Sequence, residues 1–204
     1  ALTYHLRRGN HTCMLNPAPM PFKVNRSGPG FPALTGFSLL DVQGPDAEAF
    51  LQAQLMNDVR ALAPGRWQWN GWLSPKGRVI ALFALVRTAP TAFLLILPDV
   101  AADDLRLALQ RFVFRSKVQL AVRGDASCAA AFDDEAGSAA GPLDAVCGEV
   151  PGDLRLAWHG EDGPRYLLIL PAASPHLAAA DPATDARWLS ADLALGLPRL
   201  PESQ

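Results

Sequence analysis

The chain has 204 residues, of which 50% are hydrophobic and 19% are charged, as in an ordinary soluble globular protein. Its 18 basic and 20 acidic residues give a net charge of −2 and a pI of about 6.1, which excludes a strongly basic protein but leaves room for a local basic patch. No apolar run approaches the ~18 residues that a membrane-spanning helix needs, so we expect no membrane segment.

Cysteine and histidine spacing predicts no metal site. Cys13, Cys128 and Cys147 are widely separated and form no CxxC pair, so they indicate neither a disulfide framework nor a zinc site. The four histidines are scattered and match no HExxH-like pattern.

Residues 1–32 contain five prolines and no hydrophobic periodicity, which predicts an irregular lead-in. Arg7 and Arg8 are not followed by the apolar core of a signal peptide. We assign this segment no function.

A central stretch, residues 37–86, reads as a strand, a helix and two further strands. The strand 37–42 is stopped by Gly44 and Pro45, and Pro45 suits the first position of a helix. Asp46 and Glu48 then place negative charge in the first turn, where the helix dipole favours it. One apolar face follows at helical spacing: Ala47, Phe50, Leu51 and Leu55.

The two strands of this stretch are 67–73 and 79–86, joined by a type I turn at 74–77. Because side chains alternate along a strand, Trp67 and Trp69 share one face and Trp72 lies on the other, unless Gly71 introduces a bulge. The strand 79–86 is continuously apolar, so we expect it to be covered on both faces.

A further strand, 92–97, ends at Pro98, and Asp99 is the expected cap of a second helix. That helix has one apolar stripe: Ala101, Leu105, Ala108, Leu109 and Phe112. A strand at 118–122 follows, so the first module closes near residue 123.

The second half repeats this pattern loosely. Segments 93–105 and 166–177 share a strand, a proline and a short helix start, and further strands are expected near 129–132, 146–150 and 154–158. The acidic and glycine-rich segment 133–141 reads as an exposed loop, and Gly196 as a helix C-cap. We predict an α+β fold with a lead-in (1–32), a first module (33–123) and a second module (124–204).

Four segments, in order, resemble one family: GPDAEAFLQAQLMNDV, LSPKGRV, FRSKVQL and RWLSADLALGLP. Together they cover roughly residues 33–201 and look like the YgfZ-type folate-binding proteins, relatives of the glycine-cleavage T protein and of mitochondrial iron–sulfur assembly factors. The resemblance implies two ferredoxin-like α/β modules of the aminomethyltransferase folate-binding fold. Family members continue into a K-G-C-x-G-Q-E signature and a C-terminal barrel, which we expect to be absent from this chain.

The resemblance implies a tetrahydrofolate pocket with aromatic walls. Trp188 matches the tryptophan that relatives place against folate, and Phe37 stands where some relatives have another tryptophan. Trp69 and Trp72 are further candidate wall residues, since a flat pterin needs apolar and aromatic walls. The alternative is that these aromatic side chains only fill the core.

Three cations are candidates for the glutamate tail of folate: Lys76 and Arg78 flank the hairpin turn, and Arg115 follows the second helix. The alternative is that they are solvated surface charges.

The carboxylates of the aminomethyltransferase branch are missing. The aligned positions hold Ala81, Leu82 and Ala194, and a methyl or isobutyl group cannot take over acid–base or charge-stabilising work. Asp192 precedes Ala194 by two residues, which points it away from that position on a helix. We therefore predict no catalytic residues.

The resemblance thus implies a tetrahydrofolate-binding accessory protein, which we expect to be cytoplasmic and monomeric. The resemblance implies that it supports assembly or repair of iron–sulfur enzymes, including a tRNA-thiolating one, with those enzymes or assembly proteins as partners. We do not expect direct nucleic-acid binding. The alternatives are a folate-dependent aminomethyltransferase and an interaction module without a ligand.

Overall fold

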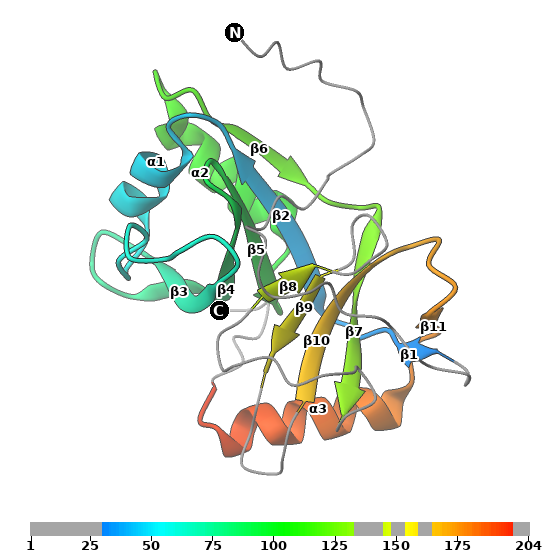
Figure 1. The fold of residues 1–204 in the computed structure, drawn as a ribbon. Helices are drawn as coiled ribbons and strands as arrows, with labels where there is room; N and C mark the ends of the chain where they lie inside the picture. The colour runs from blue at the N-terminus through cyan, green and yellow to red at the C-terminus, as the bar shows by residue number, and fades with distance from the viewer. Residues whose placement is uncertain (1–29, 133–144, 148–153, 159–164, 198–204) are drawn as a thin grey trace, which may run out of the picture.

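The computed structural model of the chain describes residues 30–132, 154–158 and 165–197, together with the backbone of 145–147 (Figure 1). These residues form strands and helices in a mixed α+β arrangement. Their order is β1 (Phe31–Pro32), β2 (Phe37–Gln43), α1 (Ala47–Gln54), β3 (Trp67–Leu73), β4 (Val79–Ala89), β5 (Ala92–Pro98), α2 (Ala102–Val113), β6 (Gln119–Val122), β7 (Ala126–Phe132), β8 (Ala145–Cys147), β9 (Leu154–Ala157), β10 (Arg165–Pro171), β11 (Leu177–Ala178) and α3 (Pro182–Ala194).

The first sheet has the strand order β3-β4-β5-β2-β6, and all neighbours are antiparallel. Strands β4, β5, β2 and β6 with helices α1 and α2 follow the ferredoxin-like order, to which β3 adds an edge strand. Both helices bury apolar residues against one face of this sheet, including Phe50 and Leu51 of α1 and Leu105 and Leu109 of α2. The predicted α+β class and the ferredoxin-like character of this half are confirmed.

The second sheet, β7-β10-β9-β8, is also antiparallel and packs against the uncovered face of the first. Leu39 and Ile96 of the first sheet share one core with Leu156 and Ile169 of the second, and Trp188 of α3 closes this core. In Figure 1, α3 lies at the bottom of the view, beneath β10 and β7. Among the described residues no closed barrel is formed.

Two predicted helix starts were wrong. Helix α1 begins at Ala47 rather than Pro45, and its N-cap Asp46 makes no side-chain cap; its carboxylate instead accepts a hydrogen bond from the backbone N–H of Lys117 at 2.7 Å. Helix α2 has Ala101 as N-cap, and Asp99 stands before it in a left-handed conformation (φ 60°). The Asp46 carboxylate is therefore held by a distant segment, and the backbone N–H of Asp99 donates to the carbonyl of Gly36.

The predicted hairpin is confirmed, with the N–H of Gly77 donating to the carbonyl of Ser74 at 2.9 Å. The continuous burial expected for 79–86 is wrong at its start, since Val79 and Ile80 are 48% and 45% exposed. Phe112, expected on the buried stripe of α2, is also half exposed.

The second half differs from the expected repeat. After β10 the chain makes turns and the short strand β11, which pairs in parallel with β1, instead of starting a helix directly. Phe31, which lies within the expected lead-in, belongs to β1 and is fully buried. The expected loop 133–141 and residues 148–150 of the expected strand lie outside the described residues, and the domain boundaries stay a prediction.

Helix α3 has strong signals at both ends. The Asp181 carboxylate accepts N–H bonds from Ala183 and Thr184, and Pro182 stands in the first turn. The hydrogen bond from the Thr184 hydroxyl, together with these two N–H bonds, lowers the pKa of Asp181. At the other end Gly196 (φ 70°) donates to the carbonyl of Leu193 at 2.9 Å, as the sequence predicts for a C-cap. None of the helices in the described part of the chain has the length and hydropathy needed to cross a membrane.

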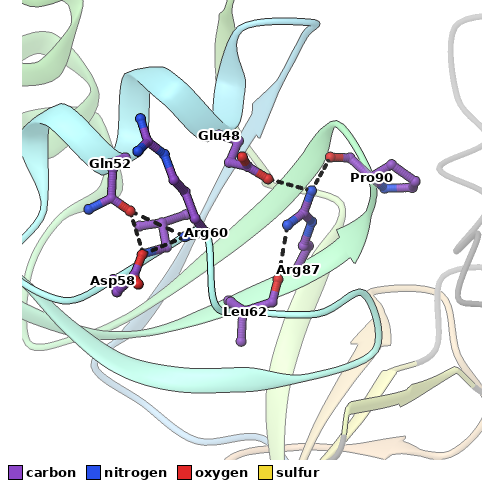
Figure 2. A network of polar contacts seen from close by, with 8 residues as sticks. Glu48, Gln52, Asp58, Arg60, Leu62, Arg87 and Pro90 are labelled. Carbon is purple, nitrogen blue, oxygen red and sulfur yellow. Dashed lines mark hydrogen bonds and ion pairs between the residues drawn. The ribbon is translucent and has the colours of Figure 1, made fainter.

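A polar network ties α1 to the loop that follows it and to β4 (Figure 2). Arg87 forms an ion pair with Glu48 at 2.7 Å and donates to the carbonyls of Leu62 and Pro90 at 3.0 and 2.7 Å. Gln52 accepts the N–H groups of the loop residues just beyond the helix. The network fixes the connection between α1 and the aromatic strand β3.

We predict that Arg87→Met lowers the free energy of unfolding by about 2–3 kcal/mol, because it leaves two carbonyls and a carboxylate without their donor. Urea unfolding followed by circular dichroism measures this. The control is Arg106→Met, which breaks only an exposed pair with Asp103 and should cost less than about 1 kcal/mol. Equal losses for both variants would show that the Arg87 network stabilises the fold no more than an exposed ion pair does.

Candidate functional site

A cavity of about 550 Å³ lies where β2 begins, β5 ends and α3 passes. Three apolar side chains form much of its wall: Phe37 from the first position of β2, Trp188 from the middle of α3 and Val100 from the segment before α2. The volume is in the range of small-molecule sites. The remaining lining residues are Leu34, Thr35, Gly36, Ser38, Asp99, Ala101, Asp185 and Leu189.

The polar groups of the cavity are held by specific hydrogen bonds. Thr35 donates its backbone N–H and its hydroxyl to the two carboxylate oxygens of Asp185, at 3.0 and 2.7 Å. Ser38 donates its hydroxyl to the carbonyl of Val100 at 2.6 Å. These bonds join the start of β2 to α3 on one side and to the segment before α2 on the other.

Trp188 is fully buried and held by a buried ion pair. Arg165 lies 2.7 Å from Asp192, donates to the Trp188 carbonyl at 3.1 Å and places its guanidinium 4.5 Å from the Trp188 ring centroid. Trp158 donates its indole N–H to the same Asp192 oxygen at 3.2 Å. Because both charges are buried and hydrogen-bonded to their surroundings, this cluster locks α3, and with it the cavity wall, onto the second sheet.

The structure brings Phe37 and Trp188 together in one cavity, although they are far apart in the sequence. Trp69 lies behind that wall, in a chain of ring contacts that runs through Trp158 (4.9 Å) to Trp188 (6.0 Å). Trp72 is on the opposite face of β3, as alternation predicts, and packs edge-on against Phe112 near the helices. Trp69 and Trp72 do not line the cavity, so its geometry gives no support to the expectation that they contact a ligand there.

The three candidate cations are not among the residues that line this cavity. Lys76 and Arg78 are exposed at the β3–β4 hairpin, and exposed Arg115 places its guanidinium 5.4 Å from the ring of Phe114. The charged side chains that do line the cavity are two carboxylates, Asp99 and Asp185. The expected contact of these cations with a glutamate tail stays a prediction.

The structure also describes the three positions that stand where the aminomethyltransferase branch has carboxylates. Ala81 is fully buried in β4, Leu82 is partly buried beside it, and Ala194 is exposed at the last position of α3. The carboxylate of Asp192 accepts hydrogen bonds from Arg165 and Trp158.

Sequence reasoning missed the two cavity carboxylates. One signal was present for Asp185, because it precedes Trp188 by three residues and so shares its side of a helix. Asp99 carried no such signal, since its pattern predicts a helix cap. Among the described residues no group of three or more histidine, cysteine or acidic side chains could hold a metal ion. The thiol of Cys128 is buried, and this burial raises its pKa.

Comparison with known proteins agrees with this fold. Residues 23–131 match the family model described as the GCVT N-terminal domain. The glycine cleavage system aminomethyltransferase T from Bartonella henselae has a similar structure, with a TM-score of 0.62, 16% identity and coverage of 74% of this chain and 47% of that one. The described residues thus have the fold class of an aminomethyltransferase T protein.

Two curated relatives match over 176 residues each. An uncharacterized protein of Haemophilus influenzae is 31% identical, over 85% of this chain and 56% of its own length, and the tRNA-modifying protein YgfZ of Edwardsiella ictaluri is 27% identical, over 80% and 53%. The chain therefore spans about half the length of the curated relatives it matches. The chain belongs to the GCVT N-terminal domain family, and its resemblance to the YgfZ-type proteins is confirmed.

We predict that Asp192→Asn lowers the free energy of unfolding by about 3–5 kcal/mol, because it leaves the guanidinium of Arg165 buried without its counter-charge. Chemical denaturation measures the loss, and Asp104→Asn, an exposed acid of α2, is the matched control. The pair Arg165→Met with Asp192→Leu should recover much of the loss. A cost below about 1 kcal/mol for Asp192→Asn would show that the pair does not hold α3.

Proposed function

We propose that the chain binds a tetrahydrofolate in the cavity between β2 and α3. The observation that carries the proposal is the convergence of Phe37 and Trp188 on one cavity of about 550 Å³. The half-buried ring of Phe37 suits the flat pterin ring, the buried Trp188 supports the lining beside it, and the carboxylates of Asp99 and Asp185 are acceptors for the N–H groups of the pterin. Family membership supports the same ligand class.

The indole Nε1 of Trp188 is buried and has no hydrogen-bond acceptor among the described residues. The Nε1 of Trp67, which does not line the cavity, is buried in the same way, so this atom by itself does not indicate a ligand. The fit of the cavity to a pterin rests on its aromatic lining and its two carboxylates.

We propose that this folate is bound without aminomethyl transfer. Transfer needs a carboxylate that handles protons or stabilises charge at the reacting carbon. Ala81 and Leu82 supply none, and Asp192 is held by Arg165 in the core. The two carboxylates that line the cavity, Asp99 and Asp185, stand at other positions, and we assign them to binding and orienting the ligand.

We predict that isothermal titration with tetrahydrofolate gives one saturable site. Phe37→Ala should weaken it about tenfold or more, since it removes one aromatic wall, and Trp188→Phe should weaken it less. Trp72→Phe is the matched control and should leave affinity unchanged, because Trp72 lies on the other face of β3. Absence of saturable binding by folded protein would overturn the proposal.

We propose further that the folate-bound protein supports assembly or repair of iron–sulfur enzymes, including tRNA-modifying ones. The support is the resemblance to YgfZ-type proteins and the match to a relative named as a tRNA-modifying protein. We predict that a cell lacking its YgfZ-type protein regains tRNA thiolation when this chain is supplied within the full-length protein, and that Phe37→Ala reduces the recovery. Equal recovery with the unmodified chain and with Phe37→Ala would show that the role in the cell does not depend on ligand binding in the cavity.

A further inference from the structure

The charge of the cavity restricts what it can bind. Asp99 and Asp185 are the charged side chains among its lining residues, and none of the lining residues is a cation. Carboxylates are acceptors only. These charges therefore favour a ligand portion that presents N–H or O–H donors and is neutral or positively charged, and they disfavour an anionic group.

Asp185 is the better placed of the two carboxylates. It stands one helical turn before Trp188 on α3, and the two hydrogen bonds from Thr35 fix the plane of its carboxylate. Each of its oxygens accepts one bond from Thr35 and keeps capacity for another. Two other acids of this helix have different partners: Asp181 caps the helix, and Asp192 pairs with Arg165.

Asp99 lies at the edge of the same cavity in a backbone conformation that non-glycine residues rarely adopt (φ 60°). Its backbone N–H donates to the carbonyl of Gly36 at 2.7 Å, and Gly36 itself has φ 74°. A Cβ on Gly36 would come within 3.2 Å of an Asp99 carboxylate oxygen. The left-handed conformation costs Gly36 little, whereas at Asp99 it is backbone strain of the kind that gathers at binding sites.

We propose that Asp185 is a specificity-determining residue of this cavity, which selects the donor edge of a 2-amino-4-oxopyrimidine ring. Such a ring presents the N3–H and one 2-amino N–H side by side, and these two donors match the two oxygens of one carboxylate. The inference rests on the proposed folate binding and deepens it. The pterin head enters beside Trp188, and the anionic glutamate tail points away from Asp99 and Asp185.

The test exchanges one donor on the ligand and one charge on the protein. 6-Methylpterin carries the 2-amino group, and 6-methyllumazine has a carbonyl oxygen in its place, which faces a carboxylate with an acceptor instead of a donor. We expect the unmodified chain to bind 6-methylpterin about tenfold tighter than 6-methyllumazine by isothermal titration. In Asp185→Asn, whose amide can turn a donor toward the carbonyl, the preference should fall to about twofold or less.

Asp104→Asn is the control, because it removes an exposed acid of α2 that does not line the cavity, and it should keep the tenfold preference. Circular dichroism melting verifies that each variant is folded. Should Asp185→Asn fail to fold, Thr35→Val removes the hydroxyl that orients Asp185 and should reduce the preference in part.

The outcomes separate this inference from the proposal beneath it. One contrary result is a chain that binds tetrahydrofolate without preferring 6-methylpterin to 6-methyllumazine, and another is a chain that binds tetrahydrofolate but neither of these two. Each of these results would overturn the role of Asp185 and would leave the proposal of folate binding intact. Failure of folded protein to bind any of the three ligands would overturn both. A tenfold preference that survives in Asp185→Asn would also overturn the role of Asp185.

Discussion

The buried pair of Arg165 and Asp192 is the interaction on which the position of α3 depends. Neither charge can be buried alone at an acceptable free energy, so α3 must dock in the one register that brings them together. That register presses Trp188 into the core shared by the two sheets and turns Asp185 toward the start of β2. The cavity is thus a consequence of how one helix is fixed to a sheet.

Much of the fold was predictable from local patterns, because those features depend only on neighbouring residues. Strand β3 has the predicted bounds, the hairpin turn at Gly77 forms, and Gly196 caps α3. The helix starts were wrong for a non-local reason: Asp46 accepts a bond from Lys117, a residue of another segment. The exposed start of β4 was missed because apolar content does not reveal where a sheet extends beyond its covering layer.

The site was only half predictable. A resemblance to a folate-binding family pointed to Phe37 and Trp188, and the fold places them in one cavity. The same reasoning sought cations for the glutamate tail, whereas the cavity has an acidic lining. Which charges face a cavity depends on the packing of α3 against β2, and no pattern within one segment encodes it. The helical spacing of Asp185 and Trp188 was the one usable signal.

We expect the ligand to bind beside Trp188 and not beside Trp72, which packs near the helices. This expectation is tested most directly by nitrogen-15 NMR of the indole N–H signals of the five tryptophans, assigned by single Trp→Phe substitutions, during titration with tetrahydrofolate. We expect the Trp188 signal to move most and the Trp72 signal to stay in place. A moving Trp72 signal with a stationary Trp188 signal would place the ligand on the other face of β3 and contradict the site described here.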